Sequence, residues 1–162
     1  MILAVCLAAT VISVQAGEDN RLGVGAHYWT TVDGIDVDNV DENGFSWMAS
    51  YQHWSSLLGF EADIEWFQSG FAGENKDVYA PQAYLLVGGT LYGAVGIGAY
   101  YSDGSWGDKP FYTFRAGLNF ELIPGLYLDV NGNYRFQDWS GLEASDMDSD
   151  TIILGAAARL AF

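Results

Sequence analysis

Apolar side chains recur at every second residue along most of this sequence, and a period of two predicts β-strands rather than helices. Strands in soluble domains usually have about 5–6 residues, whereas a tilted strand that crosses a bilayer needs about 9–11. Most of the alternating segments fit the longer class, so the sequence predicts an all-β chain that spans a membrane. The eight segments are Arg21–Val32, Phe45–His53, Leu58–Phe67, Asp77–Gly88, Leu91–Tyr101, Phe111–Leu122, Leu126–Gln137 and Thr151–Phe162.

The connections between these segments alternate between short and long. The short ones follow the second, fourth and sixth segments, at Trp54–Leu57, Gly88–Thr90 and Ile123–Gly125. The long ones follow the first, third, fifth and seventh segments, at Asp33–Gly44, Gln68–Lys76, Ser102–Pro110 and Asp138–Asp150. Short turns on one rim and long loops on the other are typical of an outer-membrane barrel. We therefore predict an eight-stranded antiparallel up-and-down transmembrane β-barrel.

The residues between the apolar positions carry the charged side chains of the strands. In a membrane barrel the apolar face meets lipid and the polar face points inward. An arginine that faced mid-bilayer lipid would cost about 2–4 kcal/mol, and the strand arginines avoid that face. The charge network expected in the barrel interior consists of Arg21, Glu61, Asp63, Glu65, Arg115, Glu121, Asp129, Arg135 and Arg159.

Buried charges persist only when they are paired and hydrogen-bonded, so we expect salt bridges across the lumen. If the first strand runs outward, these bridges fall in two layers. The layer of the periplasmic half would hold Arg21, Glu121, Asp129 and Arg159, and the layer of the outer half would hold Glu65, Arg115 and Arg135.

The first sixteen residues, MILAVCLAATVISVQA, carry no charge and end their apolar run in the small-x-small sequence Val14-Gln15-Ala16. This pattern is typical of a secretory signal peptide, although no Lys or Arg precedes the run. The run is also shorter than the roughly 20 residues of a transmembrane helix. We expect a signal peptide over residues 1–16 and a barrel domain over residues 17–162, which lacks cysteine because Cys6 is the only one.

The last segment, TIILGAAARLAF, keeps its alternation up to the terminal Phe162. With the signal peptide, the eight segments and the alternating loop lengths, it makes residues 17–162 resemble the small OmpA/OmpX-like "outer membrane protein beta-barrel" family. The resemblance implies a location in the outer membrane in contact with its lipid. It also implies that the last strand pairs with Arg21–Val32 and that the barrel-assembly machinery reads Phe162 as an assembly signal. Such signals often carry a second aromatic residue two positions earlier, where this chain has Leu160.

The formal net charge of −15 leaves no basic face to neutralise phosphates, which excludes nucleic acid as a partner. Most of the acidic residues fall in or beside the four long connections, and we expect this rim to attract divalent cations or a surface ligand. Asp146, Asp148 and Asp150 have the opening spacing of a calcium loop, but Thr151 stands where the loop needs glycine. We therefore predict solvated acidic loops, with no dedicated metal site and no cofactor.

We predict a non-enzymatic barrel that presents acidic extracellular loops for envelope structure or surface interaction. His27 and His53 show no grouping with a serine and an acid of the kind that a hydrolase needs. Glu61, Asp63 and Glu65 are interpreted as salt-bridge partners rather than as a glycosidase pair. Two alternatives stay open: a small, cation-leaning pore of low conductance, and a soluble lipocalin-like carrier, which would turn the apolar faces inward.

Overall fold

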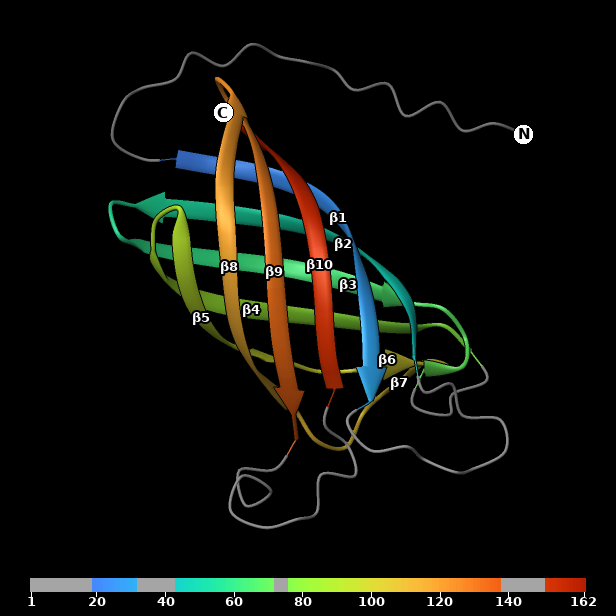
Figure 1. The fold of residues 1–162 in the computed structure, drawn as a ribbon. Helices are drawn as coiled ribbons and strands as arrows, with labels where there is room; N and C mark the ends of the chain where they lie inside the picture. Colours follow the sequence, from blue (N-terminus) through green and yellow to red (C-terminus); the bar gives the residue numbers. More distant parts are fainter. Residues whose placement is uncertain (1–18, 32–42, 72–75, 138–150) are drawn as a thin grey trace, which may run out of the picture.

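The long strands of this chain form one closed antiparallel β-barrel (Figure 1). The computed structural model describes residues 19–31, 43–71, 76–137 and 151–162. The eight long strands are β1 (Asp19–Thr31), β2 (Asn43–Ser55), β3 (Leu58–Phe67), β4 (Val78–Gly88), β5 (Leu91–Gly98), β8 (Phe111–Ile123), β9 (Leu126–Phe136) and β10 (Thr151–Ala161). The predicted fold class is confirmed.

The barrel closes because the first and last strands pair. β1 and β10 run antiparallel from Arg21 opposite Ala161 to Thr31 opposite Thr151. Every other long strand pairs with the strands that precede and follow it among the eight. This is an up-and-down order, and closure leaves none of the eight strands as a free edge.

Three tight turns join strands at one end of the barrel, where the C-terminus also lies (Figure 1). They contain Ser56-Leu57, Gly89-Thr90 and Pro124-Gly125. Proline pre-sets φ at the first central position, and Gly125 supplies the positive φ of 82° that the second position of a type II turn requires. The backbone N–H of Ala161 donates to the Gly125 carbonyl at 2.8 Å, which ties the last strand to this turn.

The outer face of the barrel is an apolar belt. Outward positions alternate with inward ones in every long strand, and the outward side chains remain exposed, up to 67% for Val24 and 70% for Leu91. Aliphatic residues such as Leu154 and aromatic residues such as Phe45 and Trp47 share this face. A surface of this composition matches hydrocarbon rather than water.

The fifth predicted segment is interrupted in the structure. β5 ends at Gly98, which pairs with Gln82 of β4. The residue that would pair next is Pro81, which precedes Gln82 and has no N–H for the ladder. Pairing with β4 resumes in β6 (Tyr101–Ser102), which turns through Asp103 and Gly104 into β7 (Ser105–Trp106). Both turn residues have positive φ. The alternation of the sequence does not predict this small hairpin.

Candidate functional site

The interior of the barrel holds a set of buried charges that begins with three carboxylates on β3. Glu61, Asp63 and Glu65 occupy alternate positions, so their side chains share the inward face. They are 0%, 7% and 0% exposed. The arginines that they meet come from β8, β9 and β10, on the other side of the lumen.

Glu61 lies at the centre of this charge network and binds two arginines. Its Oε1 accepts from Arg115 Nη1 at 2.7 Å, and its Oε2 lies 3.1 Å from Arg159 Nη2. Arg115 also donates to Asp63 at 3.4 Å, and Arg159 Nε lies 3.6 Å from Asp129 Oδ2. These contacts connect β3 with β8, β9 and β10 across the lumen.

Glu65 forms a second group of contacts nearer the end of β3. It accepts from Arg135 Nη2 at 2.8 Å and from Ser46 Oγ at 2.5 Å, and it lies 2.9 Å from His27 Nδ1. The same Arg135 Nη2 also donates to Gln82 Oε1 at 3.1 Å. Four strands other than β3 therefore meet at this one carboxylate and its arginine.

Neutral side chains supply further hydrogen bonds around the ion pairs. Gln52 donates to Glu61, and the Asn133 oxygen accepts from Arg115 Nε at 2.5 Å. Tyr92 donates its hydroxyl to Asp129 at 2.9 Å. The Tyr84 ring lies 3.8 Å from the Arg115 guanidinium carbon. A buried ion pair is favourable only when its remaining donors and acceptors are also matched, and these residues supply part of that matching, while Asp63 Oδ1 and Arg135 Nε have no hydrogen-bond partner among the described residues.

Apolar clusters flank the charges on both sides along the lumen. At the end of the long connections the cluster contains Trp29, Phe67, Phe71, Val78, Ala80, Phe111 and Ile153. At the end of the tight turns it contains Trp54, Tyr84, Leu86, Tyr92 and Ala94. The ring of Phe71 stacks on Phe67 at 3.9 Å and meets Trp29 edge-on at 4.8 Å. Packed rings and aliphatic groups thus lie toward both ends of the lumen.

The structure brings seven of the nine predicted interior residues together and places two elsewhere. Glu121 is exposed at the end of β8 and accepts from the backbone N–H of Gly125 at 3.0 Å. Glu121 pairs with Tyr127 and keeps the inward phase, but it lies next to the tight turn, beyond Asn119, the last buried residue of β8. Arg21 pairs with Asp19 and lies over the Tyr127 ring at 3.5 Å, apart from the network. The two expected layers are joined, because Glu61 binds arginines from both.

Sequence reasoning missed the apolar ends of the lumen. Trp29, Phe67 and Ile153 share the inward phase of His27, Glu65 and Arg159 in their own strands. Leu86 likewise shares the phase of Gln82, which explains why the fourth segment alternated poorly. The signal that could have revealed them is an apolar residue at a strand end in the otherwise polar phase.

His27, Ser46 and Glu65 resemble the parts of a hydrolase triad but differ in arrangement. A triad needs the histidine to contact the serine that it activates. Here Ser46 Oγ and His27 Nδ1 both bind the same Glu65 oxygen. Among the described residues, His27 Nε2 has no hydrogen-bond partner. His53 lies at the turn end, where its Nδ1 is 2.9 Å from Asn20 Oδ1.

Most of the predicted acidic rim lies outside the described residues. Residues 33–42 and 138–150, with the spacing Asp146, Asp148, Asp150, lie there. Within the described ranges, Lys76 pairs with Asp103 on the rim, where both side chains are more than half exposed. In these ranges, no three His, Cys, Asp or Glu side chains are placed so that they could hold a metal ion.

Comparison with solved structures identifies the fold. The chain superposes on the crystal structure of Neisserial surface protein A with a TM-score of 0.54 at 14% identity, covering 91% of this chain and 98% of that one. The N-terminal β-barrel domain of Pseudomonas aeruginosa OprF gives 0.53 at 9% identity, with 90% and 99% coverage. A structure from the de novo design of transmembrane β-barrels gives 0.50 at 17% identity, with 90% and 98% coverage.

No protein-family model matches the sequence, and neither does any curated protein. Within the described residues, no helix has the length and apolar character needed to cross a membrane. The assignment of the fold therefore rests on the structural likeness and the closed barrel.

Proposed function

We propose that this chain, which has the fold of the small eight-stranded outer-membrane β-barrels, is a closed and non-enzymatic surface anchor. It lies in the outer membrane and presents acidic loops for envelope structure or surface interaction. Divalent cations or a cationic surface ligand are the partners that suit such loops.

The observation that carries this proposal is the filling of the lumen. Apolar clusters at both ends enclose an ion-paired centre in which Glu61, Arg115 and Arg159 are at most 3% exposed. An interior of eight strands is just wide enough for side chains to fill. A path for ions would have to break these pairs and move both clusters, which argues against a pore.

Two further features support an anchor rather than an enzyme or a carrier. Ser46 hydrogen-bonds to Glu65 and not to His27, so the histidine does not activate it. The exposed face is apolar and the interior is charged, the reverse of a soluble carrier that must hold an apolar ligand in its lumen. An anchor needs only a stable barrel and exposed loops.

Conductance measurements test the closed state. The refolded protein is added to planar lipid bilayers, with a general porin as the positive control for insertion. We expect no stable conductance steps from the wild-type protein at either polarity. Steps that recur with one size and a preference for cations would overturn the closed anchor in favour of a small pore.

Protease treatment of intact cells tests the display of the loops. An enzyme that cleaves after acidic residues should cut within 33–42 or 138–150, where Asp36, Asp38, Asp146 and Asp148 lie, and should leave the barrel strands intact. The same protein in lysed spheroplasts controls for access from the other side. Complete protection in intact cells, with cleavage only after lysis, would contradict surface display.

A further inference from the structure

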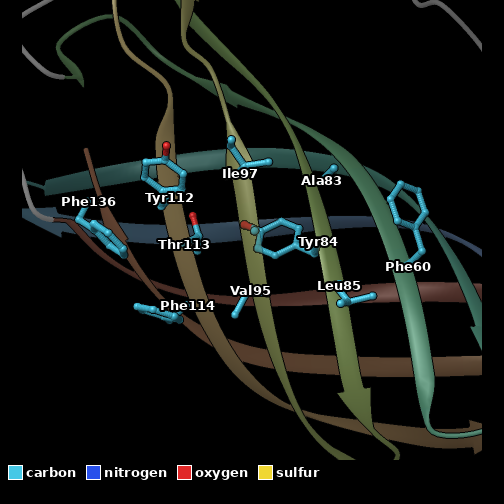
Figure 2. A pocket seen from close by; sticks show the side chains of 11 residues that line it. Phe60, Ala83, Tyr84, Leu85, Val95, Ile97, Tyr112, Thr113, Phe114 and Phe136 are labelled. Carbon is cyan, nitrogen blue, oxygen red and sulfur yellow. The ribbon is translucent and has the colours of Figure 1, made fainter. Parts of the chain in front are cut away.

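A groove of about 470 Å³ crosses the outer face of the barrel over β3, β4, β5 and β8. Figure 2 shows two rows of side chains along it, Tyr112, Ile97 and Ala83 in one row and Phe114, Val95 and Leu85 in the other. Strand register produces these rows, because Ala83 pairs with Ile97 and Ile97 with Tyr112. The groove is therefore part of the sheet and does not depend on a loop.

The depth of the groove comes from a small residue between larger ones. Ala83 is the smallest side chain of its row. Two larger side chains project beside it: Leu85 on the same strand, and Phe60, which pairs with Leu85 from β3. At the other end the rings of Tyr112 and Phe114 pack on Phe136 with centroids 5.9 and 5.5 Å apart. Phe136 is only 1% exposed, so this end of the groove is a fixed aromatic wall.

The chemistry of the groove selects hydrocarbon. None of the described residues that line it is charged, and its outward side chains, among them Val95 and Ile97, are about half exposed on the apolar belt. A void in this region would forfeit dispersion contacts along its walls. A flexible linear chain can fill an open groove that runs across several strands. The volume of the groove lies within the roughly 300–1,000 Å³ that is usual for ligand pockets.

We infer that one acyl chain of a zwitterionic phospholipid lies in this groove and exchanges more slowly than the chains of surrounding lipid, an inference that rests on the proposed outer-membrane anchor. The groove reaches Tyr112, near the start of β8, and the preceding rim carries the exposed Asp103 and Asp108. Together with the net charge of −15, these carboxylates disfavour an anionic headgroup there.

Native mass spectrometry of the refolded full chain in micelles containing phosphatidylethanolamine tests the inference. Ala83→Phe fills the groove. Ala158→Phe is the matched control, because Ala158 faces outward on β10, on the opposite side of the barrel. We expect the wild type and Ala158→Phe to retain one lipid at activation energies that strip the rest. We expect Ala83→Phe to lose it, with an apparent affinity reduced about tenfold.

Three other results would overturn the inference. Equal retention by wild type and Ala83→Phe would mean that the groove holds no particular lipid. Preferential retention of lipid A in a parallel micelle series would replace the phospholipid by an anionic glycolipid. A dimer mass that Ala83→Phe abolishes would assign the groove to a second copy of the chain. A heat-dependent shift on an SDS gel shows that each variant is a folded barrel, so failure here is distinguishable from failure of the proposed anchor.

Discussion

At the residue scale, the interior depends on a few side chains that each hold several partners. Glu65 binds Arg135, Ser46 and His27, and it is completely buried. Removing one partner from a buried pair leaves an uncompensated charge, which costs more than the pair itself contributes. The stability of this barrel should therefore be sensitive to single changes in the lumen and tolerant of changes to exposed charges.

Glu65→Ala should lower the free energy of unfolding by about 3–5 kcal/mol, because Arg135 loses its carboxylate. Urea unfolding in lipid vesicles, followed by tryptophan fluorescence, measures the loss. Glu65→Gln should lose less, since it keeps the shape and hydrogen-bonding capacity. Glu121→Ala, at an exposed position, should change stability by less than about 1 kcal/mol. Equal losses for Glu65→Ala and Glu121→Ala would contradict a structural role of the network.

Gly155→Ala should destabilise the barrel through His27. A β-carbon at position 155 would lie 1.8 Å from His27 Cδ2. Overpacking of this kind costs about 1–3 kcal/mol. In the double variant Gly155→Ala/His27→Ala the clash is removed, so the combined loss should be smaller than the sum of the single losses by about 0.5–3 kcal/mol. Additive losses would show that His27 does not set the limit at Gly155.

At the element scale, the strands differ in how much of them could be predicted. β3 begins and ends at the predicted residues, because apolar and acidic side chains alternate strictly from Phe60 to Trp66. Glu121 was misplaced because the alternation shows the phase of a residue but not where along β8 the buried part of the lumen ends. The β6–β7 hairpin was missed because it depends on where Pro81 falls opposite the neighbouring strand. The ion pairs could be expected as a set, but the choice of partners depends on which strands lie across the lumen.

Phe162, which follows β10 at the end of the chain, leads to a prediction about assembly. Phe162 donates its backbone N–H to Asn20 at 2.9 Å, and its side chain is 37% exposed. Phe162→Ala should refold in detergent as well as the wild type, since the backbone bond is kept. In cells it should lower the fraction of folded, heat-modifiable protein in the outer membrane. Phe120→Ala, at a similarly exposed phenylalanine of β8, serves as control and should leave assembly unchanged.

At the scale of the whole molecule, the barrel is a closed hydrogen-bonded cylinder with charged contents. All eight long strands are paired on both sides, and the cross-lumen ion pairs join walls that do not touch through the sheet. Such a structure should resist detergent as a unit. Loss of any one strand would open two ladders and expose buried charge, so unfolding should be cooperative.

The washed membrane fraction should show this cooperativity on an SDS gel. The unboiled protein should migrate as a compact band and shift to the position of the fully unfolded chain on boiling. Glu65→Ala should shift at a lower temperature than wild type, while Glu121→Ala should match it. A soluble protein with no shift would contradict the membrane barrel.

The order of the charges along the chain has a consequence for biogenesis. The acidic partners Glu61, Asp63 and Glu65 belong to β3, whereas the arginines that bind them follow at 115, 135 and 159. During export the carboxylates therefore emerge long before their partners, and the last arginine arrives three residues before the C-terminus. In a chain that is only partly exported, these carboxylates are unpaired, and an unpaired charge inside a membrane is energetically costly. We therefore expect insertion to wait for these arginines, and a chain truncated before β10 should stay in the aqueous compartment.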